Sequence, residues 1–261
     1  MNVNVDEGDK KVMDILGEKF TIGSWITLGH PAIAEILSDA GFDWLVIDLE
    51  HSVITIREAE DLIRVIDLKG VVPLVRLSSN NSEQIKRVMD AGAHGVIVPM
   101  VKSRIEAEMA VEAVKYPPSG KRSVGLARAQ GYGTRFGKYE SWQAKGSLVI
   151  VQIEHIDAVN NLEEILSVNG VNGYIVGPYD LTGSLGKPGD FECPEFLEAM
   201  ERINTIAKRI GMPGGLHIVE PDIQQLIKCI DDGAQFIAYS LDIRILDVFA
   251  REALSKVKEL R

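Results

Sequence analysis

Cysteine is scarce in this sequence of 261 residues, which contains only Cys193 and Cys229. Two cysteines exclude a disulfide framework and any four-cysteine zinc site. Basic residues are also few, with 28 Lys and Arg against 38 Asp and Glu, a formal net charge of −10. A surface that binds nucleic acid or an anionic membrane needs clustered Lys and Arg, so this charge balance argues against both partners.

Long hydrophobic runs are missing as well. No apolar stretch approaches the ~18–20 residues that cross a bilayer, and the N-terminal segment, MNVNVDEGDKK, is polar and acidic. Apolar residues still make up 46% of the chain, enough for a sizeable core. These features predict a cytoplasmic globular protein, and the length fits one TIM barrel of about 250 residues or a pair of smaller domains.

Short apolar segments alternate along the chain with longer segments of helical period. The expected strands are rich in Val and Ile and mostly continuous, which is typical of strands buried on both faces of a parallel sheet. They are residues 21–26, 44–48, 72–77, 95–100, 148–154, 173–176, 214–218 and 236–241. The amphipathic segments include residues 56–68, 82–91, 105–114, 158–166, 194–210 and 222–230.

Eight strands in this length leave about 33 residues for each unit, close to one βα repeat. The first strand is not followed by the glycine-rich fingerprint of dinucleotide-binding sheets. The pattern therefore predicts an α/β protein with a single (β/α)8 TIM barrel over residues 1–261. Residues 1–19 are expected to form a helical lead-in. The C-terminal helix of residues 243–261 is expected to pack on its own barrel or to exchange with a partner.

Two segments interrupt this alternation of expected strands and helices. Residues 117–147 are rich in glycine, basic and aromatic residues and poor in helical period, and residues 177–193 are rich in Gly and Pro. Both are expected to be long loops, which in compact domains are commonly functional. The second follows a strand directly, so it lies at the carboxyl end of the barrel, where TIM-barrel active sites lie. The first begins at the opposite end, although it is long enough to fold back or to reach a neighbour.

Polar side chains stand at the carboxyl ends of four expected strands, which share one mouth of a barrel. They are Asp48, Glu50 and His51, then Arg76, then Gln152 and Glu154, and finally Asp180. Glu154 and Asp180 follow neighbouring strands, and two carboxylates without a thiolate suit a hard octahedral cation such as Mg²⁺ or Mn²⁺. Asp180 also follows a rigid Gly177-Pro178 turn that can present backbone N–H groups. The plainer alternative for each carboxylate is a solvated or salt-bridged acid.

His51 carries a side chain that can move a proton near neutral pH. Either Asp48 or Asp90, at the end of the third helical segment, could orient its imidazole. Arg76 lies among apolar residues, so its guanidinium needs an anionic partner. It either neutralises an acid in the barrel or stabilises a developing oxyanion, and we favour the second. The plainer alternative for His51 is a structural histidine at the barrel rim.

These residues lie in sequence blocks that resemble the HpcH/HpaI aldolase family, the metal-dependent class II pyruvate aldolases. The blocks occur in order through most of the chain. They are AGFDWLVIDLEH (40–51), VPLVR (72–76), IKRVMDAGAHGVIVPMV (85–101), YPPSGKRSVGLARA (116–129), VQIE (151–154), GVNGYIVGPYDLTGSLG (170–186) and the acid of YSLD (239–242). The resemblance implies a barrel of the phosphoenolpyruvate/pyruvate type. It also implies reversible cleavage of a 4-hydroxy-2-oxo acid to pyruvate and an aldehyde through a metal-stabilised enolate.

The resemblance further implies a role for each matching position. Glu154 and Asp180 would bind the divalent metal, Mg²⁺ or Mn²⁺ with Co²⁺ as a further candidate, and no organic cofactor is needed. His51 would be the general base on pyruvate or on a metal-bound water, with Asp90 raising its basicity and Asp48 supporting it.

The remaining matching positions would handle pyruvate itself. Arg76 would stabilise the enolate oxygen. Gln152 and the backbone of the Gly177, Pro178, Tyr179 and Asp180 turn would hold the pyruvate carboxylate. The sequence departs from the family pattern at Leu49, Tyr179 and Thr182. Several of these departures lie where the aldehyde portion should bind, so the aldehyde partner stays open.

Two other functions remain as alternatives. A lyase acting on a CoA thioester, as in the related citrate- and malyl-CoA lyase barrels, would need basic contacts for the CoA tail. The 117–147 segment is the basic-rich candidate for them, through Lys121, Arg122, Arg128 and Arg135. A non-catalytic barrel is the other alternative, against which the complete set of ligands, base and oxyanion partner argues. The resemblance also implies a homo-oligomer, a hexamer with exchanged terminal helices.

Overall fold

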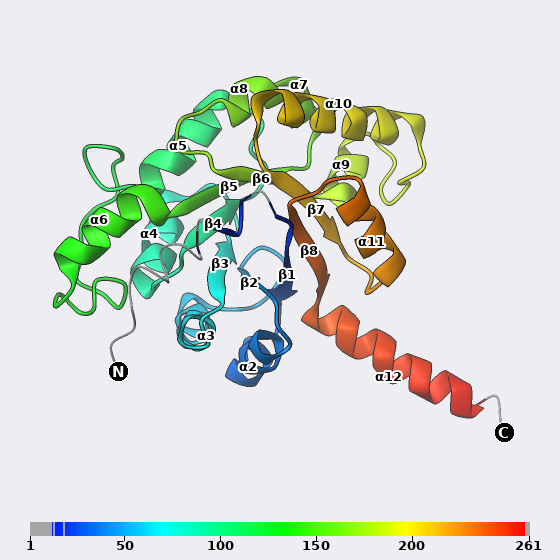
Figure 1. The fold of residues 1–261 in the computed structure, drawn as a ribbon, viewed down its shortest axis with the longest axis horizontal. Coiled ribbons are helices and arrows are strands. Elements are labelled where there is room, and N and C mark those ends of the chain that lie inside the picture. Colours follow the sequence, from blue (N-terminus) through cyan, green and yellow to red (C-terminus); the bar gives the residue numbers. More distant parts are fainter. Residues whose placement is uncertain (1–11, 13, 18, 259–261) are drawn as a thin grey trace.

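The structure, a computed structural model, describes residues 12, 14–17 and 19–258. Within them eight parallel strands close into a barrel in which β8 pairs with β1 (Figure 1). The strands are β1 (Thr21–Ile26), β2 (Trp44–Asp48), β3 (Val72–Arg76), β4 (Gly95–Val98), β5 (Leu148–Ile153), β6 (Gly173–Val176), β7 (Gly214–Ile218) and β8 (Phe236–Leu241). The predicted (β/α)8 fold is confirmed. The lead-in predicted for residues 1–19 falls mostly outside the described residues.

Helices follow the strands, and most of them cover the outside of the barrel (Figure 1). They are α2 (Pro31–Asp39), α3 (Ile56–Leu68), α4 (Ser82–Ala91), α5 (Arg104–Val114), α6 (Phe136–Gly146), α7 (Ile156–Asn160), α8 (Leu162–Leu166), α9 (Pro178–Ser184), α10 (Pro194–Ile210), α11 (Ile223–Asp231) and α12 (Asp242–Lys258). Local sequence sets where they begin. For α3, the Thr55 hydroxyl accepts the Glu58 N–H and the Glu58 carboxylate accepts the Thr55 N–H, which pairs donors that a helix start leaves free.

Large apolar side chains fill the barrel interior, so it is a core and not a pore. Trp44 and Phe236 stack there with ring centroids 3.9 Å apart. Gly23 on β1 makes this stack possible, because a Cβ at that position would lie 2.1 Å from the Trp44 ring. The strands β2 to β6 are buried along their whole length, as their continuous apolar sequences predict.

Three predictions about the segments between strands are wrong in detail. Residues 158–166 belong to two short helices, α7 and α8, separated at Asn161. The 177–193 segment is not a loop throughout, because α9 begins at its second residue. The 117–147 segment contains α6, which tertiary contacts support: the Lys115 ammonium donates to the Gln143 and Ser147 carbonyls over 3.1 and 2.7 Å. Such non-local contacts do not appear in a helical period.

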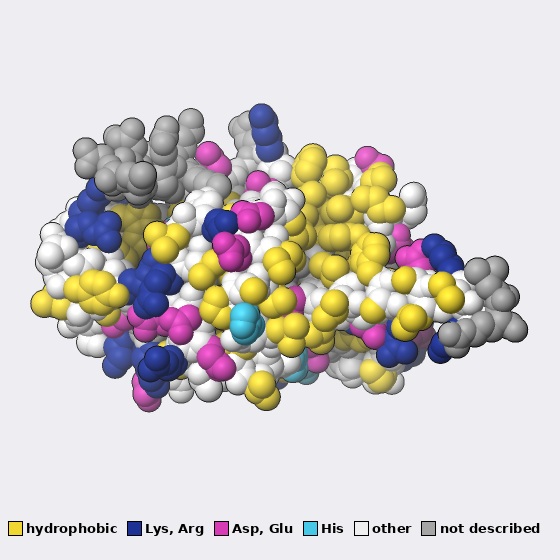
Figure 2. Space-filling model, turned by 90° about the horizontal axis from the view of Figure 1, so that it is seen from below, with side chains coloured by type: hydrophobic (Ala, Val, Ile, Leu, Met, Phe, Trp, Pro, Cys, Tyr) yellow, Lys and Arg dark blue, Asp and Glu magenta, His cyan; other side chains and the backbone are white. Residues whose placement is uncertain are grey.

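The C-terminal helix α12 projects away from the barrel (Figure 1). Its first residue, Asp242, is buried, and its carboxylate accepts the backbone N–H groups of Thr27 and Leu28 over 2.9 and 2.8 Å. Hydrophobic side chains line the projecting helix (Figure 2), among them Ile243, Leu246, Phe249, Leu254 and Val257, all exposed. None of the helices in the described part of the chain is long and apolar enough to cross a membrane.

Candidate active site

An ion pair between β2 and β3 forms the floor of the mouth at the carboxyl ends of the strands. Asp48 and Arg76 are register partners. The guanidinium binds the carboxylate with two hydrogen bonds, Nε to Oδ1 at 2.9 Å and Nη2 to Oδ2 at 2.7 Å. Burial by itself would raise the pKa of Asp48, but the bonds and charge of Arg76 bring that pKa below its ordinary value. Arg76 thus neutralises a buried acid, the first of the two roles that its sequence environment predicts.

The Arg76 guanidinium has one nitrogen, Nη1, that makes no hydrogen bond to Asp48. Its Nη1 lies 3.3 Å from Glu50 Oε2, and its central carbon lies 4.2 Å from the centroid of the Trp25 ring. Nε and Nη2 are bonded to Asp48, so Nη1 is the nitrogen that remains for Glu50 and for a ligand beside it. A planar guanidinium held by a fork and an aromatic face has little freedom to move.

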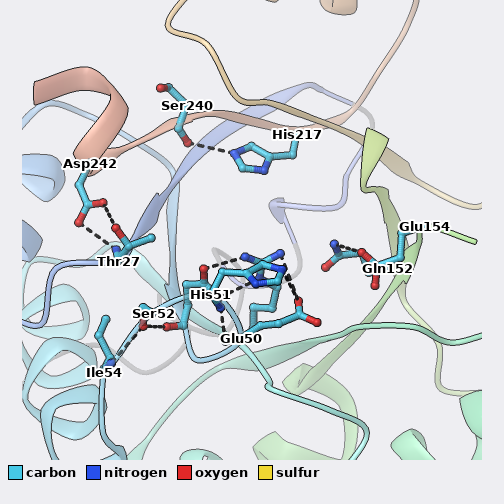
Figure 3. Close-up of polar contacts among 12 residues, drawn as sticks. Thr27, Glu50, His51, Ser52, Ile54, Gln152, Glu154, His217, Ser240 and Asp242 are labelled. Carbon is cyan, nitrogen blue, oxygen red and sulfur yellow. Dashed lines mark hydrogen bonds and ion pairs between the residues drawn. The ribbon is translucent and has the colours of Figure 1, made fainter. Parts of the chain in front are cut away.

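His51 stands at the rim of the same mouth, with a side chain that is 62% exposed. Asp48 does not orient its imidazole, contrary to one of the predictions. Asp48 Oδ1 instead accepts the backbone N–H groups of Glu50 and His51, over 3.0 and 3.3 Å, and so fixes the turn after β2. Glu50 is the carboxylate beside the imidazole, with Oε2 3.9 Å from His51 Nε2 (Figure 3).

Glu50 is a site residue whose position after a strand predicts that it reaches the mouth but predicts no role for it. Its side chain is largely buried between Arg76 and His51. Burial raises the pKa of Glu50 despite the nearby Arg76 charge. The signal that could have identified it is the run Asp48-x-Glu50-His51, which places three ionisable groups in one turn after β2.

Glu154 follows β5 and is almost completely buried. Its Oε1 accepts the Met100 N–H over 2.7 Å, and its Oε2 accepts the Gln152 side-chain amide over 2.5 Å (Figure 3). Met100 has a φ of 54°, a left-handed conformation that is strained for a residue other than glycine. Burial raises the pKa of Glu154 to about 7, and the charges of Glu50 and Asp180 act in the same direction.

Asp180 lies in the first turn of α9, which begins at Pro178 directly after β6. It is exposed, and it is close enough to Glu154 for its charge to affect the pKa of that carboxyl. The first turn of a helix leaves backbone N–H groups without intrahelical partners, here those of Tyr179 and Asp180. The Tyr179 ring packs edge-on against Phe191 at 5.0 Å.

The oxygen atoms of this mouth fit a hard divalent cation. Glu50, Glu154 and Asp180 bring three carboxylates near one another, and Gln152 Oε1 is a buried oxygen without a hydrogen-bond donor among the described residues. Buried acceptors of this kind need a proton, a donor or a cation. Residues 12, 14–17 and 19–258 contain no cluster of three or more His, Cys, Asp and Glu able to hold a metal by themselves. Glu154 and Asp180 would therefore hold the ion together with water and substrate.

Asp90 lies away from this mouth. It is near the end of α4, at the barrel end where the strands begin. There Gln130 Nε2 donates to its carboxylate over 3.3 Å, and Arg122 Nη2 lies 3.9 Å away. The prediction that Asp90 pairs with His51 is wrong within one chain, because a helix returns the chain to the opposite end of the barrel before Asp90 is reached.

The raised pKa of Glu154 leads to a prediction about pH. A cation must displace the proton of a carboxyl whose pKa is about 7, so we expect Mn²⁺ affinity to fall about tenfold per pH unit below that value and to level off above it. Electron paramagnetic resonance of free Mn²⁺ between pH 5.5 and 8 measures this dependence. Glu154→Gln should abolish tight binding, and Glu164→Gln, an exposed control, should not. Affinity of the wild type that does not change over this range would contradict the prediction.

Known proteins resemble this chain over most of its length. The family model described as HpcH/HpaI aldolase/citrate lyase matches residues 21–247. The hydroxypyruvate/pyruvate aldolase of Sagittula stellata is 38% identical, over 86% of this chain and 88% of its own length. The 2-keto-3-deoxy-L-rhamnonate aldolase of Klebsiella pneumoniae is 34% identical, over 85% and 82%. The crystal structure of an HpcH/HpaI aldolase/citrate lyase family protein from Burkholderia cenocepacia superposes with a TM-score of 0.89 at 32% identity, covering 96% of this chain and 98% of that one. The chain therefore belongs to the HpcH/HpaI aldolase/citrate lyase family.

Proposed function

We propose that this chain is a divalent-metal-dependent aldolase, a carbon–carbon lyase that reversibly cleaves a 4-hydroxy-2-oxo acid to pyruvate and an aldehyde. The observation that carries the proposal is the grouping of Glu154, Asp180, His51 and the forked Arg76 at one barrel mouth. It joins a site for a hard cation, a proton-transfer group and a fixed positive charge. The similar proteins named above, both aldolases of 2-oxo acids by name, support the same reaction class.

Each side chain has a defined task in this proposal. A cation held by Glu154 and Asp180 (Mg²⁺ or Mn²⁺, with Co²⁺ as a further candidate) would supply a Lewis acid for the keto oxygen of pyruvate. His51 removes a proton from the methyl group and returns it in the reverse direction. The Nη1 edge of Arg76 stabilises the negative charge that develops on the keto oxygen. Asp48 keeps Arg76 and the His51 backbone in place.

The pyruvate carboxylate would be held on the β5 and β6 side of the mouth. Gln152 uses one amide hydrogen on Glu154 and retains a second for the carboxylate. The N–H groups of Tyr179 and Asp180, free at the start of α9 after Gly177 and Pro178, supply further donors. Gln152 and Glu154 are both buried, so bulk water has little access to their polar atoms.

The CoA-lyase alternative loses support because three of the four basic residues considered for the CoA tail already have partners. Arg122 stacks on the Tyr116 ring at 4.2 Å, Arg128 binds the Asp67 carboxylate, and Lys121 binds Glu112. A non-catalytic barrel has no need of a buried carboxyl such as Glu154, whose raised pKa means that its charge costs folding free energy. A metal-dependent aldolase needs no CoA contacts from the 117–147 segment, and it gives the buried Glu154 carboxyl a task as a metal ligand.

The proposal includes a homo-oligomer, with the hexamer and exchanged α12 that the family resemblance implies. Exposed apolar side chains along α12 would be covered by a second copy. A role for Asp90 in raising the basicity of His51 would also require a second copy, since the two residues lie at opposite ends of one barrel. The role of Asp90 in the proposed reaction therefore requires that the chain forms an oligomer.

A charge on the apolar face of α12 tests this assembly. We expect Phe249→Glu to lower the molar mass measured by light scattering to that of a smaller species, because a buried carboxylate is strongly unfavourable at an interface. Ser255→Glu adds the same charge on the opposite side of α12 and should leave the mass unchanged. Equal masses for the wild type and Phe249→Glu would rule out an interface through this face.

Exchange of the pyruvate methyl protons in D₂O, followed by NMR, tests the proposed function without knowledge of the aldehyde. We expect exchange by the wild type with Mg²⁺, Mn²⁺ or Co²⁺ and none after removal of metal. Glu154→Ala and His51→Ala should abolish it, while Glu164→Gln and His30→Ala should retain it. Absence of exchange with all three metals would overturn the aldolase proposal.

A further inference from the structure

His217 is an ionisable residue of the barrel interior that the proposed reaction does not use. It lies on β7, four strands from Arg76 on β3, and its imidazole packs on Trp25 with ring centroids 5.0 Å apart. The Arg76 guanidinium contacts the same tryptophan. The two side chains therefore share one aromatic platform beneath the mouth, and a molecule bound at Arg76 lies within reach of His217.

The hydrogen bond of His217 identifies its tautomer. Nε2 lies 3.3 Å from the Ser240 carbonyl oxygen, which can only accept, so Nε2 carries the proton. Ser240 has a φ of 54°, and its hydroxyl donates to the Val219 carbonyl over 2.9 Å, which holds this carbonyl in place. Burial, together with the positive charge of Arg76, lowers the pKa of His217 to about 3, so the ring is neutral. Nδ1 is then a lone-pair acceptor.

No donor among the described residues pairs with His217 Nδ1. The free edge of the ring faces the space bordered by His51, Gln152 and Glu154 (Figure 3). An acceptor in a half-buried site favours a ligand that brings an O–H or N–H group and disfavours an apolar group of the same size. Pyruvate has no such donor, and in the proposed function its keto oxygen is held by the cation site and Arg76 and its carboxylate by Gln152 and the start of α9.

We propose that His217 determines specificity for the aldehyde, with Nδ1 accepting a hydrogen bond from a hydroxyl group next to the aldehyde carbon. This inference rests on the proposed function and names its second substrate as a hydroxy-aldehyde. The strand that carries His217, β7, neighbours β6, after which Asp180 lies, so the substituents of an aldehyde beside pyruvate reach His217 when they point toward β7. A hydroxyl there meets the free nitrogen of His217, and a methyl group leaves that nitrogen unpaired.

Two aldehydes of equal heavy-atom count test this inference. Glycolaldehyde and propionaldehyde differ by a hydroxyl in place of a methyl group. We expect His217→Leu to lower the ratio of their kcat/KM values (glycolaldehyde over propionaldehyde) by about 5- to 10-fold relative to the wild type, which is the loss of one hydrogen bond. Comparison of ratios removes the intrinsic difference in reactivity between the aldehydes.

Two further measurements separate this inference from its alternatives. His217→Asn retains an acceptor near the position of Nδ1 and should keep most of the wild-type ratio. Pyruvate methyl exchange should stay within about twofold of wild type in both variants, because one hydrogen bond to the aldehyde is not used in enolisation. The Ser240 carbonyl also accepts from Ser24 Oγ at 3.3 Å, so it keeps a partner in both.

Each outcome supports or overturns one statement. An unchanged ratio in His217→Leu with normal pyruvate exchange would overturn the assignment, because ordered water would then satisfy Nδ1 for both aldehydes. An equal fall of the kcat/KM ratio in His217→Leu and His217→Asn would show that the shape of the imidazole ring, and not its acceptor nitrogen, determines the preference between the two aldehydes. Failure of wild-type exchange would instead overturn the proposed function.

Discussion

Arg76→Lys is expected to lower kcat/KM for cleavage of a 4-hydroxy-2-oxo acid by about 10²- to 10³-fold, the effect of removing one preorganised oxyanion donor. Lysine keeps the positive charge, but it cannot bind Asp48 in a fork and present a third nitrogen to the site. Nη1 is the guanidinium nitrogen that is not bonded to Asp48, and its neighbour is the Glu50 carboxylate, 3.3 Å away. Pyruvate methyl exchange should fall in parallel. Activity within tenfold of wild type would contradict the role of Arg76.

A second pair of variants separates the structural role of Arg76 from its catalytic role. Arg76→Ala leaves the Asp48 carboxylate buried without its partner, which typically costs about 3–5 kcal/mol of unfolding free energy. Arg76→Ala combined with Asp48→Asn removes that charge, so urea denaturation should show recovered stability. Activity should remain lost, because the positive charge at the keto oxygen is still absent. Recovery of both stability and activity in the double variant would mean that Arg76 acts on stability alone.

Gly177→Ala is expected to lower kcat/KM by about 10²-fold while the barrel stays folded. A Cβ on Gly177 would lie 2.9 Å from both Gln152 Nε2 and Glu154 Oε2, closer than real Cβ contacts. Either Glu154 or the start of α9 must move, and displacement of a catalytic group by about 1 Å costs activity of this order. The φ of Gly177 is −97°, so the substitution brings no backbone strain of its own.

Gly183→Ala is the matched control for this variant. It lies on the same helix, α9, and a Cβ there meets nothing within 4 Å. Alanine favours a helix over glycine by about 1 kcal/mol, so this variant should be as stable as wild type or more stable, with unchanged activity. Mn²⁺ affinity, measured in parallel, should fall only in Gly177→Ala. Equal Mn²⁺ affinities in both variants would show that Glu154 tolerates the added methyl group.

The barrel could be predicted because its signals are local. Continuous apolar strands, amphipathic segments and the repeat length of the βα unit each arise from neighbours in sequence, and β1, β2 and β6 to β8 have the predicted bounds. The predictions failed where structure depends on distant residues. The helix α6 is an example, because Lys115 binds the carbonyls at its end from a different part of the chain.

The sequence alone also determined which residues reach the mouth, since a residue just after a parallel strand can only lie at the carboxyl end. Tertiary structure decided how their atoms pair. The fork between Arg76 and Asp48 depends on the register of β2 and β3, and the neutral tautomer of His217 depends on a carbonyl of β8. Asp90 was misplaced although the βα order indicates its position, because it ends a helix that follows a parallel strand and such a helix finishes at the barrel end where the strands begin. Pair contacts are properties of three-dimensional register, which no local pattern encodes.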